Sequence, residues 1–216
     1  MSAAIYAVAD LEALSPTPLP AAAAAMAEAG VRWIQVRAKH LSGAGWYALM
    51  EDCCRALEGS GADLWVDDRA DVAALFPVAG LHVGQADLPP LAARRLLGGG
   101  VRIGQSTHDA EQFAAADEDE AVDVIAVGPV FPTTGKERPA PVVGLDFVRW
   151  ARARTAKTLV AIGGIDESNV AAVLAAGADS AAVLGAVCRG DRSNRGDRGD
   201  VRDIGASCRR LIAAAG

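Results

Sequence analysis

The sequence predicts a single-domain α/β protein in which eight parallel strands close into a TIM (β/α)8 barrel. Short apolar runs alternate with helical segments, one strand about every 27 residues along the chain. This alternation implies parallel pairing through right-handed crossovers. A doubly wound sheet should carry a glycine-rich phosphate fingerprint after its first strand. The chain has Asp10, Leu11 and Glu12 there, so we favour a closed barrel over an open sheet.

Each predicted strand is a run of three to six residues rich in Val, Ile, Leu or Ala. Gly30, Gly80 and Gly177 stand shortly before such runs, where a glycine commonly ends the preceding helix. The predicted strands cover residues 5–8, 33–36, 64–66, 81–83, 101–103, 122–127, 159–162 and 181–184. The predicted helices cover residues 19–29, 46–57, 72–76, 91–97, 110–116, 145–153, 169–176 and 204–214.

The end of the chain departs from this pattern, because residues 189–203 are a tract of Arg, Asp and Gly with no apolar face. We therefore predict a barrel over residues 1–188, a flexible insertion over 189–203, and a C-terminal helix over 204–216 that packs on the barrel.

Composition and charge exclude several classes of partner. The formal net charge of −6 gives no general attraction to nucleic acid or to an anionic membrane. The four cysteines, at positions 53, 54, 188 and 208, lack the spacing of a zinc site and are expected to be free thiols. No signal peptide or membrane span is recognisable, so we expect a cytoplasmic protein. The sequence leaves the oligomeric state open, with a homodimer among the options.

A basic group follows the second predicted strand. Gln35, Arg37 and Lys39 alternate with apolar residues, so a period of two places all three side chains on one side. An arginine fork and a lysine ammonium suit a diphosphate, although exposed charges on an edge strand remain the alternative.

Carboxylates follow the next two strands. Asp68 and Asp87 would meet at the barrel mouth, and Mg²⁺ commonly takes one or two carboxylates together with phosphate oxygens. We therefore predict these two as Mg²⁺ ligands. Asp67 is a candidate third ligand, but an adjacent residue on a strand points the other way, so we place Asp67 among the substrate-binding residues instead. Helix capping is the alternative role for Asp67 and Asp68. Ser106, after the fifth strand, is a candidate hydrogen-bond donor to a substrate.

The sixth strand opens into a loop, residues 128–136, that has the composition of a phosphate site. Small residues such as Gly135 let backbone N–H groups approach an anion, and Thr133, Thr134 and Lys136 add two hydroxyls and an ammonium. A solvated loop is the alternative reading.

A second anion site is expected after the last two strands. In such barrels the loops at these positions commonly bind a monophosphate through backbone N–H groups, and here they contain Gly164, Leu184 and Gly185. Two anion sites at one mouth predict joint binding of two phosphorylated substrates and group transfer between them.

Six segments together resemble the thiamine-phosphate synthase family. They are QVRAK at 35–39, VDDRADVA at 66–73, GLHVGQADLP at 80–89, IGQSTH at 103–108, GPVFPTTGK at 128–136 and AIGGI at 161–165. The resemblance covers about residues 5–187. It implies a TIM barrel that joins a hydroxymethylpyrimidine diphosphate to a thiazole phosphate and releases pyrophosphate.

The resemblance also implies roles for the residues at the mouth. Those expected to hold the pyrimidine diphosphate are Gln35, Arg37, Lys39, Ser106 and Lys136, with Mg²⁺ on Asp68 and Asp87. Those expected on the thiazole phosphate side are Thr133, Thr134, Gly164, Leu184 and Gly185. Loss of pyrophosphate would leave a pyrimidinylmethyl cation that the thiazole nitrogen captures. Stabilisation of the leaving group would then fall to Arg37, Lys39, Lys136 and the metal.

Two positions differ from the family pattern. The family usually has Asn where Asp67 stands and a second Thr where Gly135 stands, so one amide and one hydroxyl contact are lost. Two alternative functions therefore stay open. One is a thiazole tautomerase, which would need neither Mg²⁺ nor the diphosphate and has a His where this chain has Pro129. The other is a paralogue that binds these phosphates without turnover.

Overall fold

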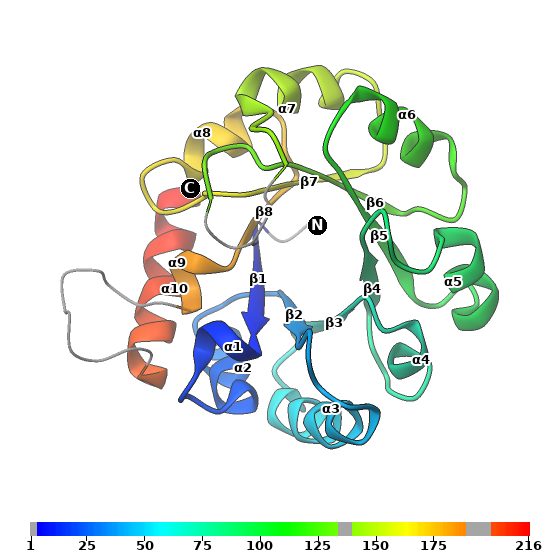
Figure 1. The fold of residues 1–216 in the computed structure, drawn as a ribbon. Coiled ribbons are helices and arrows are strands. Elements are labelled where there is room, and N and C mark those ends of the chain that lie inside the picture. Colours follow the sequence, from blue (N-terminus) through cyan, green and yellow to red (C-terminus); the bar gives the residue numbers. More distant parts are fainter. Residues whose placement is uncertain (1–3, 134–139, 189–199) are drawn as a thin grey trace.

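The computed structural model describes residues 4–133, 140–188 and 200–216. Eight parallel strands pair in chain order, and β1 also pairs with β8, which closes the barrel (Figure 1). The predicted fold class is therefore confirmed. The strands are β1 Ile5–Asp10, β2 Trp33–Arg37, β3 Asp63–Asp67, β4 Gly80–Val83, β5 Arg102–Thr107, β6 Val124–Val127, β7 Thr158–Ile162 and β8 Ser180–Val183.

Helices surround the barrel, and their apolar faces pack on the outward side chains of the strands (Figure 1). They are α1 Leu11–Leu14, α2 Leu19–Glu28, α3 Gly43–Leu57, α4 Ala70–Ala73, α5 Pro90–Leu97, α6 Ala110–Glu118, α7 Gly144–Arg152, α8 Val170–Ala175, α9 Gly185–Cys188 and α10 Val201–Ala215. The short helices α1 and α9 were not predicted, because each is a single turn placed directly after a strand.

The predicted boundary of the last helix is wrong by three residues. Helix α10 begins at Val201 rather than at residue 204, because the Asp200 carboxylate accepts a hydrogen bond from the Arg202 N–H at 3.3 Å and caps the helix. The helix packs against α2, α8 and α9. Residues 189–199 of the predicted insertion lie outside the described residues.

Three aromatic residues fill the barrel interior toward the N-terminal ends of the strands. We call this cluster the aromatic floor; it consists of Tyr6, Trp33 and Trp65. Their ring centroids lie 5.1 to 5.5 Å apart. The guanidinium carbon of Arg102 lies 4.7 Å from the centroid of Trp33 and 5.1 Å from that of Trp65. A Cβ on Gly80 would lie 2.3 Å from the Trp65 ring, so glycine there makes room for the indole.

Ion pairs near the N-terminal ends of the strands join neighbouring elements one to one. Three Asp residues at or just before strand starts each have an arginine partner: Asp63 with Arg102 at 2.5 Å, Asp123 with Arg94 at 2.5 Å and Asp179 with Arg152 at 2.7 Å. Asp123 and Asp179 each also accept a backbone N–H at 2.8 Å, from Ile103 and Leu159 respectively. These carboxylates therefore connect neighbouring elements at the N-terminal end of the barrel, which we call the lower rim.

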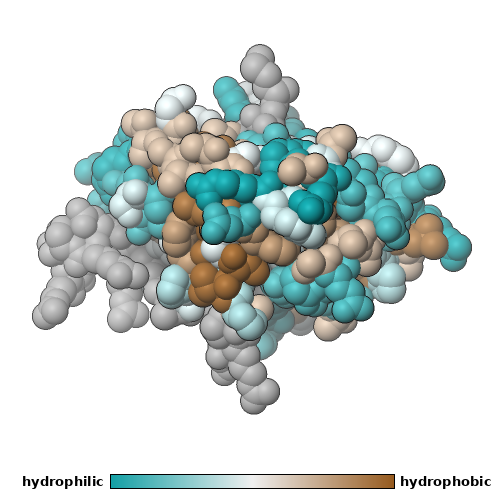
Figure 2. All heavy atoms as spheres, turned by 90° about the horizontal axis from the view of Figure 1, so that it is seen from above, coloured by the Kyte–Doolittle hydropathy of each residue, from teal (hydrophilic) through white to brown (hydrophobic). Residues whose placement is uncertain are grey.

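Figure 2 shows one side of the molecule, where hydrophilic residues surround a smaller apolar patch. Within the described ranges, no helix combines the length and apolar character that a bilayer span requires.

Candidate active site

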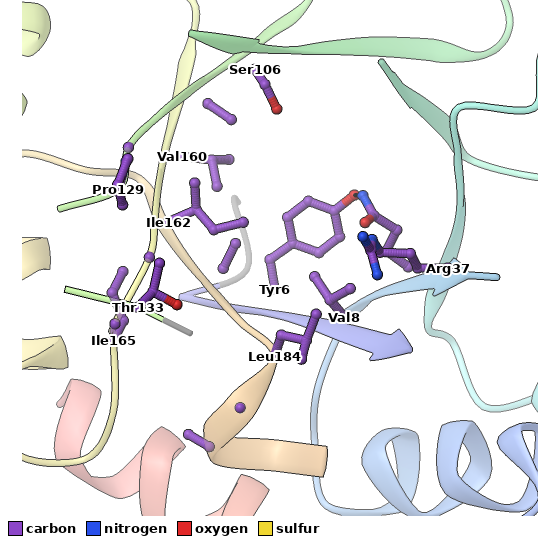
Figure 3. Close-up of a pocket in the computed structure, with 18 of the residues that line it drawn as sticks. Tyr6, Val8, Arg37, Ser106, Pro129, Thr133, Val160, Ile162, Ile165 and Leu184 are labelled. Atoms are coloured by element: carbon purple, nitrogen blue, oxygen red, sulfur yellow. Dashed lines mark hydrogen bonds between the residues drawn. The ribbon is translucent and has the colours of Figure 1, made fainter. Parts of the chain in front are cut away.

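A cavity of about 750 Å³ opens at the C-terminal ends of the strands, and all eight strands contribute to its wall. Its middle is apolar, formed by Val8, Ala126, Val160, Ile162 and Ala182. Figure 3 shows Arg37 on one side of this apolar region and Thr133 on the opposite side. The cavity thus has two polar ends, which we call the β2–β4 end and the β6–β8 end, separated by this apolar middle.

The β2–β4 end contains the predicted basic group in a network of ion pairs. Arg37 is paired with Asp10, and its Nε also lies 3.4 Å from Asp67 Oδ2. Lys39 is paired with Asp68, and its Nζ lies 3.6 Å from the same Asp67 oxygen. Asp67 therefore bridges the two cations and holds them side by side.

Crowding of carboxylates changes their pKa values here. The pKa of Asp67 is raised to about 7, mainly by burial. The charge of Asp68 also raises this pKa, whereas the charges of Lys39 and Arg37 lower it. Burial lowers the pKa of Lys39, but its hydrogen bond to Asp68 and the two carboxylate charges raise it overall. A carboxyl near its pKa is protonated part of the time and can then donate a hydrogen bond, as the amide usual at this position in the family would.

The residues predicted to hold Mg²⁺ lie together at this end. Burial raises the pKa of Asp68, and the adjacent Asp87 carboxyl adds to the rise. Asp87 Oδ2 also accepts the Gly84 N–H at 2.8 Å. Among the residues that the structure describes, no cluster of three or more His, Cys, Asp or Glu side chains is arranged for a metal. Two oxygen donors beside a space for phosphate nonetheless fit Mg²⁺, which completes its coordination with water and phosphate oxygens.

Two side chains that the sequence analysis did not select also face the cavity. Gln35 Nε2 donates to the Tyr6 hydroxyl at 2.7 Å, so Tyr6 fixes the amide of a predicted site residue. His82 Nε2 and Ser106 Oγ lie 2.9 Å apart. Tyr6 and His82 stand at inward positions of apolar strands, where a period of two could have indicated them.

The β6–β8 end is built from two loops that pack closely. The N–H groups of Val130 and Phe131 donate to the carbonyls of Ile162 at 2.9 Å and Gly163 at 3.0 Å. Gly164 has φ +66°, and a Cβ there would lie 2.6 Å from the Pro132 carbonyl oxygen. Thr133, Gly164, Leu184 and Gly185 all line the cavity as predicted, whereas Thr134, Gly135 and Lys136 lie outside the described residues.

Helix α10 adds residues to this end that were not predicted. Ser207 and Arg210 line the cavity, as does Glu167 from the loop after β7. Arg210 Nε lies 2.8 Å from Glu167 Oε1, and Arg210 Nη2 donates to Ser207 Oγ at 3.0 Å. An exposed arginine on an amphipathic helix gives no sequence signal for such a position.

Comparison with known proteins identifies the family. The family model described as thiamine monophosphate synthase matches residues 5–187. The thiamine-phosphate synthase of Koribacter versatilis is 41% identical over 83% of this chain and 86% of its own, and that of Thermobifida fusca is 43% identical over 86% and 82%. The structure of thiamine phosphate pyrophosphorylase from Pyrococcus furiosus superposes with a TM-score of 0.82 at 26% identity, covering 98% of this chain and 95% of that one. The chain therefore belongs to the thiamine monophosphate synthase family, as its six motifs predicted.

Proposed function

We propose that this protein is a thiamine-phosphate synthase of thiamine biosynthesis. It would condense 4-amino-2-methyl-5-hydroxymethylpyrimidine diphosphate with thiazole phosphate to give thiamine phosphate and pyrophosphate. The observation that carries the proposal is the division of the cavity into two polar ends with an apolar middle. Two phosphorylated substrates can place their charged groups at opposite ends and their rings against each other between them.

The β2–β4 end fits the diphosphate. Arg37 and Lys39 would bind its oxygens, because both cations are held in place by Asp67 and point toward one region of the cavity. Mg²⁺ held by Asp68 and Asp87 would supply further neutralisation of the charge that builds up on the leaving pyrophosphate. The Gln35 amide, fixed by Tyr6, would bind a polar group of the pyrimidine substrate.

The reaction then needs no protein nucleophile. The bond between the pyrimidine methylene carbon and the diphosphate oxygen breaks, and its electron pair leaves with pyrophosphate. The thiazole nitrogen gives its lone pair to the methylene carbon, which forms the new C–N bond. The protein contributes alignment of the two rings and stabilisation of the departing charge.

Pyrophosphate release by the purified protein tests this proposal. Release that requires both substrates and Mg²⁺, with thiamine phosphate as product, is the expected result. Folded protein that releases no pyrophosphate would overturn it. Isomerisation of the thiazole precursor without metal would then identify a tautomerase, and binding alone would identify a non-catalytic relative. The cytoplasmic location and the oligomeric state stay predictions.

A further inference from the structure

At the β6–β8 end, the cavity lining includes residues of the loop after β7, helix α9 and helix α10, and we call this part of the cavity the recess. Glu167 and Ser168 line it from the loop, Gly185 from α9, and Ser207 and Arg210 from α10. The sequence motifs of the family end before α10, so the last two of these residues lie outside the matched range of residues 5–187.

The contacts that anchor Arg210 in this recess include the ion pair with Glu167 at 2.8 Å and the hydrogen bond to Ser207 at 3.0 Å. The Ser207 side chain is buried, with 1% of the residue exposed, so it is a fixed partner. The side chains of Arg210 and Glu167 are 46% and 41% exposed, and such an exposed pair is weak. A phosphate that enters the recess can therefore compete with Glu167 for the guanidinium.

Arg210 carries the positive charge of the recess, and the carboxylates of Glu167 and Asp166 lie in the same lining, so a phosphate would bind the guanidinium by displacing Glu167. Asp166 Oδ1 already accepts the Ser168 N–H at 2.9 Å and the Ser168 hydroxyl at 2.6 Å within its own loop. Among the described residues that line the β6–β8 end, Arg210 supplies the guanidinium. Five N–H donors in a planar fork match a phosphate in a way that a backbone loop alone does not.

We propose that Arg210 is a phosphate-binding residue that sets the preference of the enzyme for a phosphorylated thiazole over the free alcohol. The proposal rests on the proposed function, because it assigns the monophosphate to this end of the cavity. Arg210 would bind the phosphate oxygens, with Ser207 holding the guanidinium from behind.

The variant Arg210→Gln tests this, with Arg209→Gln as the matched control. Arg209 is the preceding residue of the same helix, is exposed, and does not line the cavity. We expect Arg210→Gln to raise KM for thiazole phosphate about tenfold, to leave KM for the pyrimidine diphosphate unchanged, and to reduce the preference for thiazole phosphate over its alcohol. Arg209→Gln should match the wild type in all three quantities, and circular dichroism should show both variants folded. If Arg210→Gln instead misfolds, Arg210→Lys keeps the charge without the fork and should show a smaller rise in the same KM.

Calorimetric titration with thiazole phosphate separates this inference from the proposed function, because binding needs no turnover. Weaker binding to Arg210→Gln than to Arg209→Gln would support the role of Arg210 even if the wild type released no pyrophosphate. Equal affinities, or equal losses in the two variants, would overturn it.

Discussion

The N-terminal rim and the C-terminal mouth of the barrel both contain aspartates beside basic residues, but the two groups are paired differently. At the N-terminal end, each of three aspartates has its own arginine, and two of them also accept a backbone N–H. At the C-terminal mouth, Asp67, Asp68 and Asp87 crowd around Arg37 and Lys39, and the pKa values of Asp67 and Asp68 are raised. One-to-one pairing stabilises the lower rim. An excess of carboxylates costs stability at the mouth but leaves oxygen donors that a cation and a phosphorylated substrate can use.

The largest expected effect comes from removing a carboxylate at the mouth. Asp87→Ala should lower Mg²⁺-dependent pyrophosphate release about 100-fold or more, because it removes one of two proposed metal ligands. Its melting temperature should stay near that of the wild type, since relief of the crowding with Asp68 offsets the loss of the acceptor for the Gly84 N–H. Activity and thermal denaturation measured on one preparation give both quantities, and near wild-type turnover would remove Asp87 from the site.

Removing a carboxylate at the lower rim should have the reverse effect. Asp179→Ala takes away the ion pair with Arg152 and the acceptor for the Leu159 N–H. We expect a loss of about 2 kcal/mol in the free energy of unfolding, with kcat/KM of the folded enzyme unchanged. Urea denaturation measures the first and steady-state kinetics the second. A variant as stable as the wild type would show that the lower-rim pairs do not stabilise the barrel.

A smaller and pH-dependent effect should follow Asp67→Asn. Because the folded-state pKa of Asp67 is raised to about 7, the folded protein holds a proton that the unfolded chain has released between about pH 4 and pH 7. Wild-type stability therefore falls as the pH rises through this range, and the penalty is complete above pH 7. In EDTA, the free energy of unfolding of the variant should exceed that of the wild type by on the order of 1 kcal/mol at pH 8 and by less at pH 5. A difference that does not change with pH would contradict the raised pKa.

The fold was predictable because most strands contain a short apolar run and several of the longer helices are followed by a glycine. The residues of the β2–β4 end were predictable for a related reason, since Arg37, Lys39, Asp68 and Asp87 follow strands, and strand ends meet at one mouth. Tyr6 was missed because an aromatic residue in an apolar strand has the pattern of a core residue.

Long-range packing explains what the sequence could not show. Arg210 is remote from the other site residues in sequence, and only the packing of α10 beside α8 and α9 brings it to the cavity. The start of α10 was misplaced because Asp200 belongs to a charged tract, and its capping role appears only when the helix is formed.

The aromatic floor gives the protein an optical reporter beneath its own site. Trp33 and Trp65 pack against Tyr6, whose hydroxyl holds the Gln35 amide at the cavity wall. A ligand that engages Gln35 therefore changes the surroundings of two indoles through one intervening ring. Intrinsic tryptophan emission should follow occupancy of the β2–β4 end in unlabelled protein, with each substrate added separately and before any product can form.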